Sequence, residues 1–119
     1  MKTAVDERVR LANALGFLRE ATMHLSLPWE EQVAWLKEAR VYPTVEELGL
    51  DFGAWYPMAD QFVEAGLLSP PALAQLSEIG QLLDALAEGD EENWLPEALD
   101  SDPRWGKIRE IARAVAPCL

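Results

Sequence analysis

The sequence predicts an all-α protein, a compact bundle of about five to seven helices with no sheet. The chain has 119 residues and half of them are hydrophobic, so it can bury one sizeable core. Apolar residues recur every three or four positions over most of its length, which is the spacing of amphipathic helices. No stretch alternates apolar and polar residues in the manner of a strand. We therefore expect residues 1–119 to form a single helical domain.

Two helices are expected in the first forty residues. The first runs from Ala4 to Met23, and its predicted buried face consists of Val5, Val9, Ala12, Leu15 and Leu18. Ser26 is a candidate cap for the second helix, which runs from about Pro28 to Arg40 and ends before Pro43. Its predicted buried residues are Trp29, Val33 and Leu36.

The middle of the chain predicts shorter helices. Thr44 and Glu47 have the Thr-x-x-Glu spacing of a capping box, which predicts a short helix through Leu48. Residues 49–57 are rich in aromatic residues and lack periodicity, so we expect a packed loop or a turn of helix there. Helical spacing returns from Met58 to Ala65, and Gly66 fits the left-handed residue that ends a helix.

The longest regular pattern follows. Ser69 with Pro70 and Pro71 is a helix start signal, and the apolar stripe behind it closes at Gly89. The stripe consists of Leu73, Leu76, Ile79, Leu83 and Leu86. After an acidic loop, a short helix is expected from Pro96 to about Asp100. Ser101-Asp102-Pro103 caps a last helix, whose shared face consists of Trp105, Ile108, Ala112 and Val115.

The charge distribution is one-sided. The formal net charge is -11, from 21 acids and 10 bases. Between Arg40 and Arg104 there are fourteen acids and no Lys or Arg. Crowded like charges destabilise a compact domain, so this span predicts a basic protein partner and argues against nucleic acid and anionic membranes as partners.

Helical spacing places part of this charge on one surface. Ser77, Gln81, Asp84 and Glu88 share the polar side of the leucine-striped helix, and we call them the acidic face. The face leads directly into Asp90, Glu91 and Glu92, which we call the acidic loop. Asp60 and Glu64 are four residues apart on the preceding helix and are expected to form a second rim. We predict that these residues, with Trp94, bind the partner.

Two ordinary explanations of the acids stay open. Acids can simply solvate the surface, and Glu46, Glu47 and Asp102 stand near helix starts, where the helix dipole favours negative charge. Alternatively, the bases of the last helix can pack across the acidic span and neutralise part of it; these are Arg104, Lys107, Arg109 and Arg113.

The residues needed for catalysis and metal binding are scarce, so we predict a protein that is not an enzyme and needs no cofactor. The only His and the only Cys, His24 and Cys118, lie far apart in the sequence. No zinc motif or glycine-rich phosphate loop is present. Residues 88–93 resemble a calcium loop, but the Gly and Glu that such a loop needs at its sixth and twelfth positions are missing.

The five Trp residues are candidates for both core and interface. Trp29 and Trp105 fit the buried stripes of their helices, whereas the pattern leaves Trp35 and Trp55 undecided. Trp94 can be a buried pin for the acidic loop or an exposed anchor, and its position favours the pin. The lone Cys, the charged N-terminus and the lack of a long apolar run predict a cytoplasmic protein without a membrane span.

A stretch of about a quarter of the chain, from Leu82 to Ala112, resembles small helical immunity proteins of bacterial polymorphic and contact-dependent growth inhibition toxin systems. The resemblance lies in the leucine-rich helix end, Glu92-Asn93-Trp94, Pro96-Glu97-Ala98-Leu99, Asp102-Pro103-Arg104-Trp105, Ile108-Arg109 and Ala112. It implies a cytoplasmic protein that binds the toxic domain of a cognate effector. It provides no contact residues, because such proteins recognise their partners through variable surfaces.

Charge and resemblance predict the same function. A nuclease toxin must present a basic surface to its substrate, so an acidic protein can neutralise it. We expect a monomer that forms a 1:1 complex with a basic toxin domain. The alternative is a helical adaptor or structural subunit that assembles through apolar helix faces.

Overall fold

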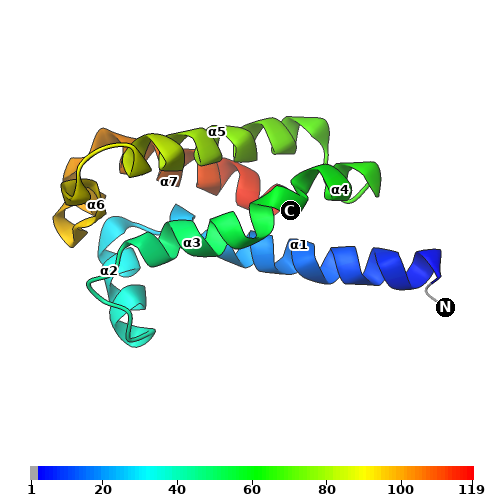
Figure 1. Ribbon diagram of the computed structural model, residues 1–119, viewed down its shortest axis with the longest axis horizontal. Coiled ribbons are helices and arrows are strands. Elements are labelled where there is room, and N and C mark those ends of the chain that lie inside the picture. Colours follow the sequence, from blue (N-terminus) through cyan, green and yellow to red (C-terminus); the bar gives the residue numbers. More distant parts are fainter. Residues whose placement is uncertain (1–2) are drawn as a thin grey trace.

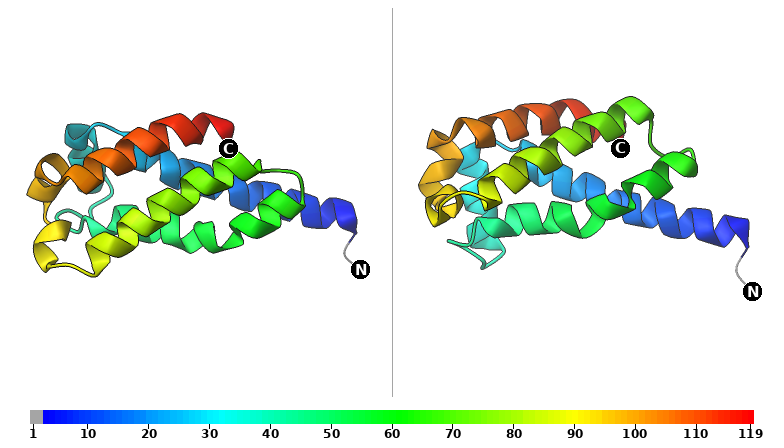
Figure 2. Two further views of the ribbon diagram at one scale, coloured as in Figure 1. Left: turned by 90° about the horizontal axis from the view of Figure 1, so that it is seen from above. Right: turned by 45° about the horizontal axis from the view of Figure 1, so that its top comes forward.

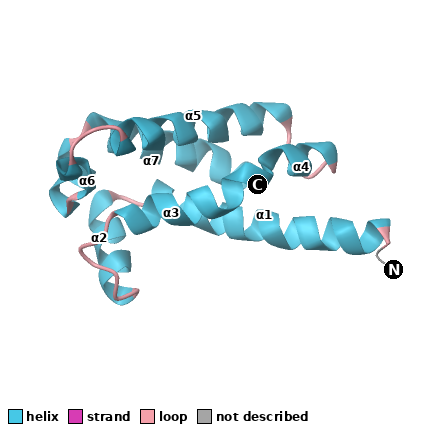
Figure 3. Cartoon of the chain, in the orientation of Figure 1, coloured by secondary structure: helices cyan, strands magenta, loops and turns pink. Residues whose placement is uncertain are grey.

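A computed structural model describes residues 3–119 of the chain. The predicted all-α fold is confirmed, since these residues form helices and no strand (Figure 3). The α-helices are α1 (Ala4–Ser26), α2 (Trp29–Glu38), α3 (Glu46–Trp55), α4 (Ala59–Glu64), α5 (Pro70–Ala87), α6 (Pro96–Ser101) and α7 (Pro103–Val115). Three 3₁₀ turns accompany them, at Tyr56–Met58, Glu91–Trp94 and Ala116–Cys118.

The longer helices run roughly along the long axis of the bundle, which measures 48 × 28 × 24 Å (Figures 1 and 2). Helix α7 packs against both α5 and α1, and α3 packs against α1 on another side. Helices α2 and α6 close one end, whereas α4 lies near the start of α5 at the other (Figure 1). The core is therefore shared by α1, α3, α5 and α7.

Helix α1 corrects part of the predicted buried face. Leu15 and Leu18 are buried as expected, but Ala12 is exposed and Val5 and Val9 are 70% and 54% exposed. The helix is 23 residues long, or about 34 Å, and its first turns project beyond the rest of the bundle (Figure 1). Periodicity identifies the apolar side of a helix, but it cannot tell whether a neighbouring element extends far enough to cover that side.

The start signals predicted for α2 and α3 were wrong. The Ser26 hydroxyl donates to the Met23 carbonyl at the end of α1, and α2 begins after Pro28 with no side-chain cap. The N-cap of α3 is Val45, also without a side-chain cap, so Thr44 and Glu47 form no capping box. Of the residues predicted to be buried in α2, only Leu36 is, and Trp29 and Val33 are half-buried.

The region 49–57 is more regular than predicted. Helix α3 continues through Leu48 to Trp55, and Phe52 is buried against the core. The apolar spacing was hard to recognise because the three aromatic residues do not share one buried side: Phe52 is buried, whereas Trp55 and Tyr56 are only half-buried.

The second half of the chain confirms the sequence analysis closely. The Ser69 hydroxyl accepts a hydrogen bond from the Ala72 N–H, and Asp102 caps α7 by accepting from the Arg104 N–H. Gly66 has a φ of 72°, the left-handed conformation expected of a residue that ends a helix. All predicted apolar residues of α5 and α7 are buried except Leu73, which is half-buried.

One buried polar cluster links α1, α2 and α7. The fully buried Gln32 donates to the carbonyls of His24 and Leu25, which end α1. Its side-chain oxygen accepts a hydrogen bond from Arg109 of α7 at 3.1 Å. Burial lowers the pKa of the Arg109 guanidinium, and the nearby Arg113 lowers it further. These contacts determine where α2 lies against the bundle.

Candidate functional site

The acidic face lies on the side of α5 that borders α3. Gln81, Asp84 and Glu88 are exposed, and Ser77 is half-buried. None of these four side chains makes a hydrogen bond or an ion pair within residues 3–119. The predicted spacing therefore places them together on one accessible side of a helix, where they can contact another molecule.

A groove of about 330 Å³ separates this face from α3. Ser77, Gln81 and Asp84 line one side, and Gly49 and Gly53 of α3 line the other. A Cβ atom added to Gly53 would meet no heavy atom within 4 Å, so the groove is open at that position. Because Gly53 has no side chain, another molecule can approach the backbone of α3 closely at that position.

The acidic loop follows α5 as an exposed 3₁₀ turn. Asp90, Glu91 and Glu92 are exposed, and their side chains form no ion pair within the described part of the chain. The neighbouring Asn93 donates to the Leu86 carbonyl at 3.0 Å, and its side-chain oxygen accepts from Arg104 at 3.1 Å. The turn is thus held from inside while its carboxylates point to solvent.

Trp94 helps to hold this turn. Its ring is half-buried and meets Trp105 edge to face, with ring centroids 5.7 Å apart. Gly49 of α3 lies against the same ring, since a Cβ added there would be 3.6 Å from it. The Trp105 indole N–H donates to the Asn93 carbonyl at 3.0 Å. These contacts agree with the interpretation of Trp94 as a pin for the loop.

The bases of α7 form few ion pairs with the acidic span. Arg104 pairs with Asp102 at 2.7 Å, and this hydrogen-bonded pair lowers the pKa of the Asp102 carboxyl. Lys107 instead pairs with Glu110, and Arg113 donates to the Ser26 carbonyl at the end of α1. Among the described residues, Asp102 is the only one of the fourteen acids in an ion pair.

The structure does not bring Asp60 and Glu64 to the acidic loop. Both side chains are exposed on α4, which lies near the N-terminal end of α5, whereas the acidic loop follows the C-terminal end (Figure 1). The expected second rim and the acidic loop are thus at opposite ends of an 18-residue helix, about 27 Å long.

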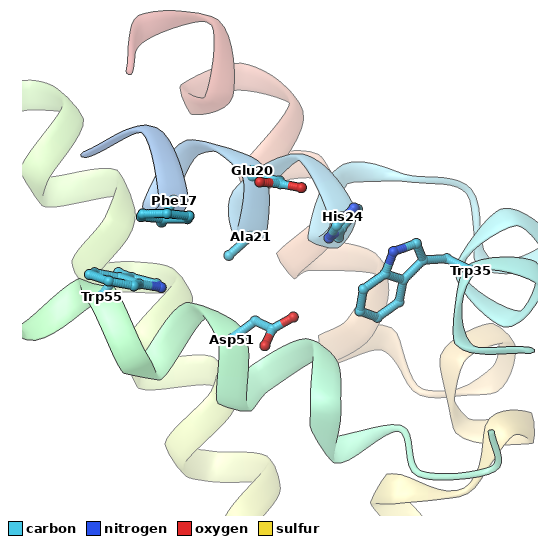
Figure 4. Close-up of a pocket in the computed structure, with 7 residues that line it drawn as sticks. All are labelled: Phe17, Glu20, Ala21, His24, Trp35, Asp51 and Trp55. Atoms are coloured by element: carbon cyan, nitrogen blue, oxygen red, sulfur yellow. The ribbon is translucent and has the colours of Figure 1, made fainter. Parts of the chain in front are cut away.

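A second depression, which the sequence analysis did not predict, lies between α1, α2 and α3 and has a volume of about 300 Å³. We call it the aromatic pocket; its lining residues are Phe17, Glu20, Ala21, His24, Trp35, Asp51 and Trp55. Figure 4 shows Phe17 over Trp55 at one end and His24 beside Trp35 at the other, with the two carboxylates between them. The ring centroids of these two pairs are 4.8 and 4.3 Å apart.

A signal for this pocket is present in the sequence. Phe17, Glu20 and His24 are spaced by three and four on α1, and Asp51 and Trp55 are spaced by four on α3. The spacing puts each set on one side of its own helix. That the two sides face each other depends on how α1 and α3 pack, which periodicity does not contain.

Comparison of the chain with protein-family models, curated proteins and solved structures finds no match. Within residues 3–119, no three His, Cys, Asp or Glu side chains gather as a metal ion would require. Nor does any described helix combine the length and the apolar character of a membrane span.

Proposed function

We propose that the protein is an immunity protein that binds a cognate basic bacterial toxin domain, most simply a nuclease, in the cytoplasm as a 1:1 complex. It makes contact through the acidic face and the acidic loop. The observation that carries this proposal is the unpaired state of these acids: Asp84, Glu88 and Asp90 to Glu92 are exposed and have no basic neighbour in an ion pair within residues 3–119.

Electrostatics explains how such a surface works. Unpaired carboxylates on a rigid helix attract a basic protein over a distance of about a Debye length, ~8 Å at physiological ionic strength. Such steering can raise association rates well above the roughly 10⁵–10⁶ M⁻¹s⁻¹ of unsteered encounters. The groove beside α3 then accepts a side chain of the partner, which gives the complex a defined orientation.

We predict that a reading frame beside the gene for this chain encodes a basic toxic domain, and that domain is the partner for the test. Co-expression should restore the growth of cells that produce that domain. The triple variant Asp84→Lys, Glu88→Lys and Glu92→Lys should slow association at least tenfold and reduce its dependence on salt. A matched control reverses Glu31, Glu38 and Glu97, which are exposed and lie outside the acidic face and the acidic loop. Equal association rates for the two variants would contradict the assignment of the surface.

Gly53 allows a test of the groove that keeps every charge. Gly53→Leu places a side chain in open space and replaces a helical glycine, so the variant should fold at least as stably as the parent. We expect it to weaken the complex by filling the groove. Unchanged affinity of a well-folded Gly53→Leu variant would exclude the groove from the interface.

The adaptor alternative has one observation in its favour, the exposed apolar residues on the projecting turns of α1. Val5 and Val9 lie four residues apart and are both mostly exposed, as surfaces for helix assembly are. Sedimentation of the purified protein distinguishes the two functions. A stable homo-oligomer that dissociates on Val5→Glu and Val9→Glu substitution supports an adaptor, and a monomer supports the immunity protein.

A further inference from the structure

We propose that the aromatic pocket receives an arginine side chain of the partner protein. This inference deepens the proposed function, and it rests on that function for the identity of the partner. It concerns residues outside the acidic face and assigns the pocket a ligand chemistry, a guanidinium group held between indole rings and two carboxylates.

The walls of the pocket suit a flat cation. Trp35 and Trp55 line the pocket at its two ends, and each is half-buried. Phe17 is stacked on Trp55 and His24 is tilted against Trp35, and both also line the pocket. Phe17 remains 52% exposed despite its contact, which is unusual for so large an apolar ring. Cations bind to the faces of such rings, and indole is the most favourable of them.

The carboxylates supply the matching charge. Glu20 comes from α1 and Asp51 from α3, and Figure 4 places both between the two ring pairs. Neither forms a hydrogen bond or an ion pair within residues 3–119, and no Lys or Arg lines the pocket. The pocket therefore contains negative charge beside aromatic surface, with no Lys or Arg in its lining to pair with the carboxylates.

Arginine fits this combination better than lysine. Its planar guanidinium stacks on an aromatic ring and still directs several N–H groups sideways toward carboxylates. It is also more weakly hydrated than an ammonium, so it loses less on leaving water. The volume of about 300 Å³ lies at the lower end of ligand pockets, which suits one side chain.

The pocket and the groove lie on the two sides of α3. Asp51 and Trp55 line the aromatic pocket, and Gly49 and Gly53 line the groove against the acidic face. A basic partner that lies across α3 can therefore occupy both depressions at once. This arrangement makes the pocket part of a larger acidic surface.

A titration with N-acetyl-L-arginine amide tests the pocket without any partner protein. The indole N–H resonances of the five Trp residues are followed by NMR. We expect saturable shifts of Trp35 and Trp55, with a dissociation constant on the order of millimolar. The neutral isostere N-acetyl-L-citrulline amide should bind at least about tenfold more weakly, and the lysine derivative should bind more weakly than arginine.

Two double variants separate the pocket from bulk charge. Glu20→Gln with Asp51→Asn should weaken arginine binding at least about tenfold, whereas Asp84→Asn with Glu88→Gln removes the same charge elsewhere and should leave it unchanged. Equal binding of arginine and citrulline, a preference for lysine, or equal losses in the two double variants would overturn the proposal. Thermal melts confirm that each variant is folded.

The outcome is independent of the test of the proposed function. A failed titration rejects the pocket and leaves the charge reversals on the acidic face to be judged by their own association rates. Conversely, if those reversals have no effect while the arginine derivative binds, the acidic face is rejected and the pocket stands.

Discussion

The acidic loop with the adjoining Trp94 and the aromatic pocket contain the same kinds of residues, indoles and carboxylates, but the structure uses them differently. In the loop region, Trp94 contacts Trp105, and Asn93 connects the turn to Leu86 and Arg104. In the pocket, the ring partners of Trp35 and Trp55 are themselves partly exposed, and the carboxylates have no partner within residues 3–119.

The difference separates residues that hold the fold from residues that are free to bind. Groups with internal partners contribute stability, because their loss leaves a cavity or an unsatisfied polar atom. Groups without internal partners contribute little, and crowded unpaired acids even lower stability through mutual repulsion. Substitutions in the two regions should therefore affect stability very differently.

The largest contrast is expected between two tryptophans. Trp105→Ala removes a fully buried ring and a hydrogen bond, so it should lower the free energy of unfolding by about 3–5 kcal/mol. Trp55→Ala removes a half-buried ring stacked on Phe17 and should cost about 1 kcal/mol. Urea denaturation of both variants measures the contrast. Similar losses would mean that the pocket is part of the core.

The next effect concerns the connection made by Asn93. Asn93→Ala takes a donor from the Leu86 carbonyl and an acceptor from Arg104, which should cost about 1–2 kcal/mol. Asp84→Asn, on the acidic face, should stay within about 0.5 kcal/mol of the parent. If denaturation midpoints showed Asp84→Asn to be as costly as Asn93→Ala, the acidic face would have a structural role.

Gly89 sharpens this test through a double-mutant cycle. A Cβ atom at Gly89 would lie 2.4 Å from the Asn93 side-chain nitrogen, so Gly89→Ala should displace that side chain and cost about 1 kcal/mol. In an Asn93→Ala background the side chain that the new Cβ would meet is absent, so Gly89→Ala should be neutral or slightly stabilising there. Additive losses would show that Gly89 matters for another reason.

The Asp102–Arg104 pair predicts a pH effect of similar size. The lowered pKa of Asp102 means that its stabilisation is fully present above its ordinary value of 3.8 and is lost as the pH falls through the folded-state value. Asp102→Asn should therefore be less stable by about 1 kcal/mol at neutral pH, and the gap should close in stronger acid. Glu92→Gln is the control and should stay within about 0.5 kcal/mol of the parent at neutral pH.

The smallest effect is a gain at the end of α2. Arg40 has a φ of 63°, which is strained for any residue with a side chain. Arg40→Gly should raise stability by about 0.5–1 kcal/mol, whereas Ala34→Gly inside the helix should lower it by a similar amount. Neither change touches the aromatic pocket, so both variants should bind the arginine derivative like the parent. A change in that affinity would show that the pocket depends on the α2–α3 loop.

The sequence predicted the α5–α7 half of the molecule well and the α1–α3 half less well. In the former, Ser69 and Asp102 each cap the helix that starts beside them in the sequence, and the buried leucine stripe lies along one side of α5. In the latter, the candidate caps Ser26 and Thr44 cap no helix, because α2 starts after Pro28 and α3 starts after Val45. The site divides in the same way: the acidic face lies on one helix and was predictable, whereas the aromatic pocket joins three helices.

By itself, the sequence determined the helical class, the second-half helix boundaries and the absence of Lys and Arg from the acidic span, because spacing, caps and composition are local properties. Tertiary structure alone decided that Val5 and Val9 lie outside the core, that Arg104 bonds Asn93, and that Glu20 faces the same pocket as Asp51. These outcomes depend on how separate elements of the chain pack against one another, and periodicity specifies the sides of a helix without specifying its neighbours.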